Sequence, residues 1–170
     1  MALPNKTSKF VLAAVLCGVA LALSLVDGAI SSLLPLPGFK LGLANIVSLF
    51  ALYYLGAPYA FSICIVRSLL AAVFSGNLTM LFFSFAGGLL SILVMCLFLR
   101  RLSLVKVSVL GGVTHNLAQL AVAALLTATP QVSYYLPVLA LMGCVCGFCM
   151  GVLCALVFSR LRRETVHQIL

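Results

Sequence analysis

One arginine, Arg67, stands inside an otherwise apolar stretch, APYAFSICIVRSLLAAVF, that runs from Ala57 to Phe74. A run of this length and composition is typical of a membrane-spanning helix. A cationic side chain inside such a helix costs about 2.5–3.5 kcal/mol on insertion scales. We therefore expect an anionic group, belonging either to the chain or to a ligand, to meet Arg67 in the folded protein.

The composition indicates the class of protein. Of the 170 residues, 65% are apolar and 7% are charged, and the mean hydropathy is +1.32. Soluble domains carry about 25% charged residues, so the sequence predicts an integral membrane protein in contact with the lipid bilayer. The net charge of +8 does not indicate a nucleic-acid partner, because the basic residues flank apolar runs and do not interleave with aromatic residues.

The apolar runs predict an all-α fold with six transmembrane helices in a single membrane domain, residues 1–170. The predicted spans are residues 10–34, 41–55, 57–75, 78–99, 105–128 and 134–159. We expect the first span to be broken near Asp27 and Gly28, because it is too long to cross a bilayer straight. The second span is short, and we expect it to begin below the membrane surface, after a turn at Pro35–Lys40.

The basic residues predict the orientation. With both termini in the cytoplasm, eight of the ten Lys and Arg residues fall on the inner side, as the positive-inside rule requires. These eight are Lys6, Lys9, Arg100, Arg101, Lys106, Arg160, Arg162 and Arg163. Lys40 then lies on the outer side and Arg67 lies within the membrane.

In this orientation most polar side chains of the membrane region converge on its outer half. The candidate site residues are Asp27, Lys40, Asn45, Arg67, His115, Asn116 and Gln119. Arg67 is expected about 10 Å below the outer boundary, at ~1.5 Å of rise per residue. His115, Asn116 and Gln119 share one helix face because of their three- and four-residue spacing. We predict an outward-opening pocket in which the cations attract an anionic solute and the amide and imidazole groups orient it.

A second interpretation needs no ligand. Asp27 pairs with Arg67 or with Lys40, and the polar groups of the fifth helix hold neighbouring helices together. We favour the pocket, because one carboxylate cannot neutralise both cations. The sequence does not tell which of the two cations Asp27 approaches.

Small residues at four-residue spacing mark helix surfaces that permit close approach of a second helix. Ala14, Gly18 and Ala22 form such a stripe in the first helix, either for packing within the bundle or for docking onto another membrane protein. Similar stripes in the fourth and sixth helices are assigned to packing; they are Ser84, Gly87, Gly88 and Ser91, and Gly143, Gly147, Gly151 and Ala155.

The sequence holds no catalytic motif. It has no GxxxxGK[ST] phosphate-binding loop, so active transport would require the nucleotide site of a partner. Asp27 and Glu164 are the two acidic residues, whereas a prenyl diphosphate synthase needs clustered aspartates to hold magnesium. We therefore expect a protein that is not an enzyme, with no catalytic residue, metal site or cofactor of its own.

Several segments resemble the bacterial Gx transporter family, which carries the label heptaprenyl diphosphate synthase component I. These segments are PGFKLGLANI at residues 37–46, Arg67, Gly87-Gly88-x2-Ser91, His115-Asn116-x2-Gln119 and Tyr135-Leu136-Pro137. The resemblance extends over roughly residues 10–160. One departure is Asp27, where we expect glutamate in the family pattern; the shorter side chain would change its reach to either cation.

The Gx family is similar to the substrate-binding S components of energy-coupling factor transporters. Those are six-helix proteins whose first helix docks onto a transmembrane coupling subunit driven by two ATPases. The resemblance implies an S-component-like bundle in the bacterial plasma membrane and a docking role for Ala14, Gly18 and Ala22.

We therefore predict a substrate-binding subunit for uptake of a small anionic solute, driven by a partner energy-coupling complex. A second hypothesis is a membrane subunit of an electron-transfer system that holds a flavin or quinone noncovalently, because related proteins look like parts of such systems. A third is an accessory component I of heptaprenyl diphosphate synthesis, although the missing aspartates argue against a synthase activity in this chain.

Overall fold

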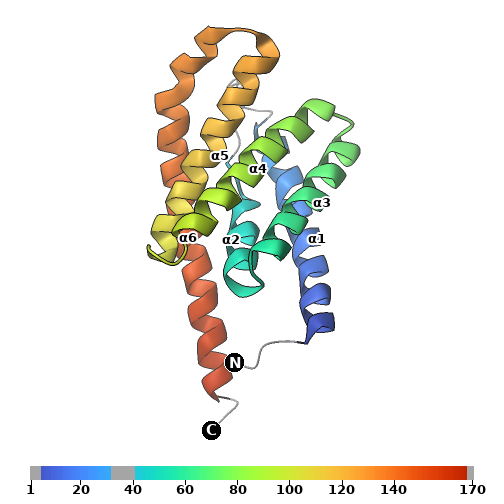
Figure 1. Ribbon diagram of the computed structural model, residues 1–170, viewed down its shortest axis with the longest axis vertical. Coiled ribbons are helices and arrows are strands. Elements are labelled where there is room, and N and C mark those ends of the chain that lie inside the picture. Colours follow the sequence, from blue (N-terminus) through green and yellow to red (C-terminus); the bar gives the residue numbers. More distant parts are fainter. Residues whose placement is uncertain (1–4, 32–40, 168–170) are drawn as a thin grey trace.

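The computed structural model describes residues 5–31 and 41–167, and within these ranges the fold is all-α (Figure 1). The helices are α1 (Lys6–Ser31), α2 (Asn45–Tyr54), α3 (Ala57–Ser75), α4 (Leu78–Phe98), α5 (Leu104–Thr127) and α6 (Leu136–His167), with a 3-10 helix, η1 (Pro130–Tyr135), before α6. Five of them, all except α2, are long and apolar enough to cross a membrane. The predicted all-α polytopic membrane protein is confirmed.

The short helix α2 occupies the centre of the bundle. It packs against α1, α3, α4, α5 and α6, and most of its side chains are buried. Its ten residues extend about 15 Å, which is half of the ~30 Å hydrocarbon core. The second predicted span, residues 41–55, is therefore a helix that cannot cross the membrane by itself.

The predicted break in the first helix is wrong, because α1 continues through Asp27 and Gly28 to Ser31. A glycine inside a helix costs only about 1 kcal/mol relative to alanine. The carboxylate of Asp27 is directed into the bundle, where it is bound by backbone N–H groups described below. The polar residue therefore fixes the position of the helix and does not interrupt it.

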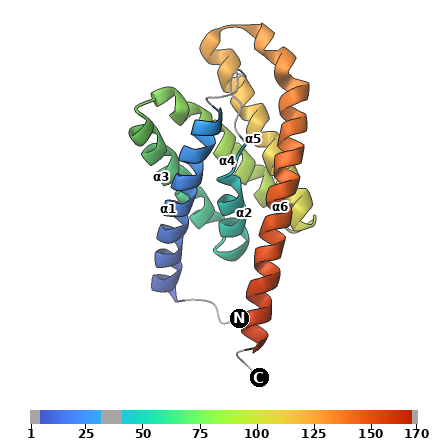
Figure 2. The same cartoon turned by 180° about the vertical axis from the view of Figure 1, so that it is seen from behind.

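An aromatic cluster closes one end of α2. The ring centroids of Phe50 and Phe158 lie 4.9 Å apart, and those of Tyr53 and Phe158 lie 4.7 Å apart. Tyr54 stacks on Phe50 at 5.7 Å. These contacts join α2 to α6 at the end of the molecule from which α6 continues beyond the bundle (Figure 2).

Glycines bring α5 and α6 into backbone contact. A Cβ atom added at Gly143 would lie 2.8 Å from Cα of Val113, and one added at Gly147 would lie 2.7 Å from the carbonyl oxygen of Ser108. Contacts this short leave no room for a side chain, so the stripe in the sixth helix serves packing, as its spacing predicts.

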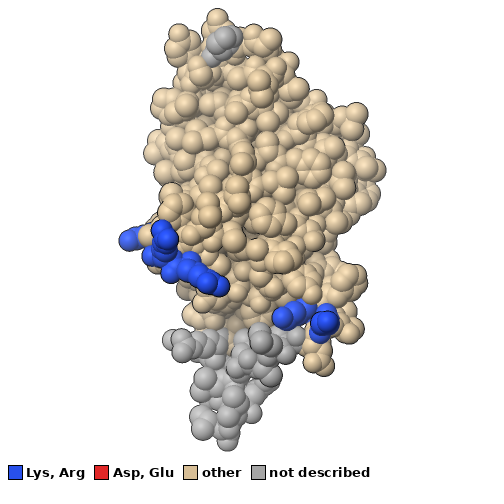
Figure 3. All heavy atoms as spheres, viewed as in Figure 1, with Lys and Arg blue, Asp and Glu red and all other residues tan. Residues whose placement is uncertain are grey.

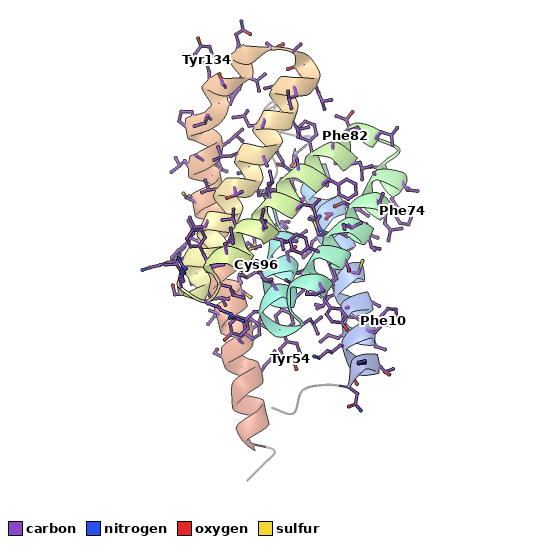
Figure 4. The ribbon with its side chains drawn as sticks, viewed as in Figure 1. Phe10, Tyr54, Phe74, Phe82, Cys96 and Tyr134 are labelled. Carbon is purple, nitrogen blue, oxygen red and sulfur yellow. The ribbon has the colours of Figure 1, made fainter. Side chains whose placement is uncertain are left out.

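The outside of the bundle is apolar, and the cations gather toward one end. Phe10, Phe74 and Phe82 are between 56% and 69% exposed and point away from the bundle (Figure 4), as expected for side chains in contact with lipid. Figure 3 shows the basic side chains near the end of the molecule where α1 begins. We call this the basic end; its described basic residues are Lys6, Lys9, Arg100, Arg101, Lys106 and Arg160. The turns α3–α4 and α5–α6 lie at the opposite end, which we call the far end (Figure 1).

Candidate functional site

A small polar cavity lies where α1, the start of α2, α3, α4 and α5 meet. Five of the seven candidate site residues line it, namely Asp27, Asn45, Arg67, His115 and Gln119. The space open to the centre of a water molecule is about 10 Å³, which is enough for roughly one water. Lys40 lies outside the described residues. The structure thus brings five candidate residues from four helices together around a nearly filled space.

Arg67 is buried and only partly satisfied. The side chain is 3% exposed; its Nη1 donates to Oγ of Ser24 over 2.8 Å and its Nη2 donates to Sγ of Cys64 over 3.7 Å. Its Nε has no hydrogen-bond partner among the described residues. The two direct hydrogen-bond partners of the buried guanidinium are therefore neutral groups, and the carboxylate of Asp27 lines the same cavity.

Asp27 binds backbone N–H groups on the approach to α2. Its Oδ1 accepts from the N–H of Leu41 at 2.8 Å, and its Oδ2 accepts from the N–H of Gly42 at 2.9 Å. Gly42 has φ +73°, a left-handed conformation that favours glycine, and its carbonyl accepts from the N–H of Asn45. The carboxylate therefore ties α1 to the segment that starts α2, a role that the sequence did not reveal.

Two of the predicted amides hold helices together. Nδ2 of Asn45 donates to Oγ of Ser91 in α4 over 3.0 Å. Nδ2 of Asn116 donates to the carbonyl oxygen of Leu139 in α6 over 3.0 Å. Asn116 does not line the polar cavity; it lies on the side of His115 that faces α6. Asn116 thus holds two helices together, as the interpretation without a ligand predicts, whereas Asn45 both joins two helices and lines the cavity.

Gln119 is fully buried, with 0% exposure. Neither its Nε2 nor its Oε1 has a hydrogen-bond partner within the described ranges. A buried amide without partners costs about 1–3 kcal/mol. Together with Nε of Arg67, the amide leaves two donor groups and one acceptor of the site available to a bound molecule.

A pair of glycines in α4 makes the space for these side chains. A Cβ atom at Gly87 would lie 2.8 Å from Nδ1 of His115 and 3.1 Å from Cγ of Gln119. One at Gly88 would lie 3.1 Å from Nη2 of Arg67 and would also overlap Sγ of Cys64. The sequence assigned both glycines to helix packing, and the structure shows that they pack against the site itself.

Sequence reasoning missed three hydroxyl or thiol side chains around the cavity: Ser24, Cys64 and Ser84. Ser24 and Ser84 line it, and Cys64 contacts Arg67. Their spacing in the sequence could have identified them. Each lies three residues before a residue at the site, namely Ser24 before Asp27, Cys64 before Arg67 and Ser84 before Gly87. Residues three apart in a helix lie on the same face.

The small-residue stripe of α1 faces away from the cavity. Ala14, Gly18 and Ala22 are all exposed, and a Cβ atom at Gly18 would meet no atom within 4 Å. On the opposite side of α1, Ala20 is 0% and Asp27 is 3% exposed. The helix thus presents its polar face to the site and its small residues to the outside.

A comparison with protein families agrees with the sequence motifs around this site. The family model for heptaprenyl diphosphate synthase component I matches residues 16–157. The chain belongs to this family. The match includes every described residue of the polar cavity, and this component I protein therefore carries the cavity within the part that defines its family. No curated protein and no solved structure gives a significant match to the chain.

Proposed function

We propose that this component I protein is the substrate-binding membrane subunit for uptake of a small anionic solute. The observation that carries the proposal is Arg67: it is 3% exposed and makes its hydrogen bonds to a hydroxyl and a thiol. Burying a charge without an opposite charge is expensive. An arriving carboxylate or phosphate group would supply that charge and would accept from Nε as well.

The other groups of the polar cavity would orient the solute. Gln119 offers a donor and an acceptor, and Asn45 and His115 line the same space. Lys40 would add a second positive charge, and Asn116 would hold His115 in place from the α6 side. Because the cavity takes about one water in this conformation, the solute would bind a state in which neighbouring side chains or helices have separated.

Transfer of the solute would require partners. With the basic end in the cytoplasm, both termini are inside and the polar cavity lies in the outer half of a bacterial plasma membrane. The exposed stripe Ala14, Gly18 and Ala22 would dock an S-component-like bundle onto a transmembrane coupling subunit that is driven by ATPases. In this proposal the chain itself is not an enzyme and carries no metal or cofactor.

The test compares two variants that each lose one positive charge. Arg67→Met removes the cation of the polar cavity, and Lys106→Met removes an exposed one near the basic end. Each protein is extracted gently from its native membrane, and bound small molecules are identified by native mass spectrometry and by chromatography of a denatured extract. We expect an anionic compound with the wild type and with Lys106→Met, and its loss with Arg67→Met. Equal retention by Arg67→Met would refute the proposal.

The family description favours a second candidate, an accessory role in heptaprenyl diphosphate synthesis. In that case the chain would bind a soluble partner that holds the aspartates missing here. Co-purification with such a partner, together with formation of prenyl diphosphates by the complex, would support it. A flavin or quinone bound to the purified protein, seen by its absorbance, would instead support the electron-transfer hypothesis.

A further inference from the structure

A second cavity, which we call the lateral cavity, adjoins the polar cavity toward the far end. The space in it that is open to the centre of a water molecule is about 200 Å³. It lies between α1 and α4, with Ala71 of α3 at its base, and apolar side chains such as Leu25 and Met80 line much of it. The cavity next to the site is thus larger and more apolar than the site itself.

The two cavities share a wall. Ser24 of α1 and Ser84 of α4 line both of them. Oγ of Ser24 also accepts the hydrogen bond from Nη1 of Arg67. A group that enters the lateral cavity and reaches Ser24 therefore contacts the residue to which the guanidinium of Arg67 is hydrogen-bonded.

The lateral cavity opens at the surface of the bundle. In the described residues the backbones of α1 and α4 do not come into contact, and the side chain of Met80 in α4 reaches across to Gly28 in α1. Leu25 and Ala29, which line the cavity, are also exposed. The opening thus lies among exposed apolar side chains, with the hydroxyl-bearing Ser75 as a further exposed residue of its lining.

We propose that the ligand of this site is an amphiphilic anion, with its anionic group at Ser24 and Arg67 and its apolar part in the lateral cavity. This inference rests on the proposed function and narrows its substrate class. The apolar lining disfavours a polar solute such as a sugar phosphate. In this conformation the volume of about 200 Å³ is below the ~300–1,000 Å³ of sites for drug-sized ligands, which favours a small amphiphile over a nucleotide.

The test uses octyl phosphate, with inorganic phosphate and 1-octanol as the two halves of the probe. Binding is measured by isothermal titration calorimetry to the full-length protein in phosphatidylcholine nanodiscs. We expect saturable binding of octyl phosphate at one site, and at least about tenfold weaker binding of either half. Equal binding of 1-octanol, or equal binding of inorganic phosphate, would overturn the inference.

Two matched substitutions on α1 locate the apolar part. Ala29→Phe fills the lateral cavity from its exposed side, and Val19→Phe adds a ring to the same helix away from the cavity. We expect Ala29→Phe to weaken octyl phosphate binding about tenfold or more and Val19→Phe to leave it unchanged. Equal effects of the two variants would show that octyl phosphate partitions nonspecifically into the bilayer, and this result would also overturn the inference.

Arg67→Met separates this inference from the proposed function. If Arg67→Met abolishes binding of inorganic phosphate and Ala29→Phe changes nothing, the anion site stands and the amphiphile is excluded. If phosphatidylglycerol in the nanodisc displaces octyl phosphate, the amphiphilic anion of this site is a bilayer lipid, and the inference stands with that source.

Discussion

Nη1 of Arg67 in α3 donates to Oγ of Ser24 in α1 over 2.8 Å, so a neutral hydroxyl is the partner of a guanidinium that is 3% exposed. A hydroxyl satisfies one donor but not the charge. Ser24 also forms part of the wall between the polar and lateral cavities. This hydrogen bond therefore joins α1 to α3 and fixes the position of the Arg67 guanidinium. It lies where the two cavities meet.

Gln119→Leu should stabilise the protein while weakening solute binding. The substitution removes a fully buried amide that has no partner in the described part of the chain, and we expect the free energy of unfolding to rise by about 1 kcal/mol or more. Asn116→Leu is the control: it removes the hydrogen bond to Leu139 and should lower stability. Thermal unfolding in detergent measures the stability of both variants. A lower stability of Gln119→Leu would show that the amide has hydrogen-bond partners in the folded protein.

Gly88→Ala should disturb the site, whereas Gly18→Ala should not. A methyl group at Gly88 meets Cys64 and Arg67, and overpacking of this kind costs about 1–3 kcal/mol. The same substitution at Gly18 meets nothing within 4 Å and replaces an exposed helical glycine. We expect a lower unfolding midpoint for Gly88→Ala alone; equal midpoints would contradict the close packing of α3 against α4.

Asp27→Asn should loosen the connection between α1 and α2. The amide keeps one acceptor oxygen for the N–H groups of Leu41 and Gly42, and hydrogen bonds to a charged acceptor contribute about 1.5–3 kcal/mol. We expect faster hydrogen exchange of these two N–H groups and a lower unfolding midpoint. Asp27→Glu retains both carboxylate oxygens, and its unfolding midpoint should fall less than that of Asp27→Asn. Unchanged exchange in Asp27→Asn would show that the carboxylate does not hold this segment.

Gly18→Leu should separate partner docking from folding. A leucine at this exposed position fills the stripe between Ala14 and Ala22 and would keep a partner helix from close approach. Cys149→Leu adds similar bulk to an exposed position of α6 and serves as the control. Pull-down from native membranes should lose the coupling subunit with Gly18→Leu and retain it with Cys149→Leu, with unfolding midpoints unchanged. Retention by both variants would place docking elsewhere.

Much of the fold was predictable because apolar runs of membrane-spanning length carry a strong signal. The predicted span 57–75 coincides with α3, and that of 78–99 differs from α4 by one residue at its end. The predicted break in α1 failed because sequence composition shows the helix-weakening glycine but not the tertiary contacts of Asp27. The length of α2 was also overestimated, since the apolar residues before Asn45 are not helical.

The members of the candidate site were easier to predict than their partners. Asp27, Asn45, Arg67, His115 and Gln119 could be grouped because polar residues in a membrane segment avoid lipid and face one another. Their bonds depend on helix rotation and depth, which the sequence does not give to within a few ångströms. For this reason neither the hydroxyl partner of Arg67 nor the backbone partners of Asp27 were predicted.

The position of α2 has a consequence for how a bound solute could leave toward the basic end. Asn45, its first residue, lines the polar cavity, and its last turn is closed by the rings of Phe50, Tyr53 and Phe158. The helix is about 15 Å long and packs against the other five helices. Inward release would require α2 to shift as a rigid piece, or the whole bundle to tilt in the bilayer.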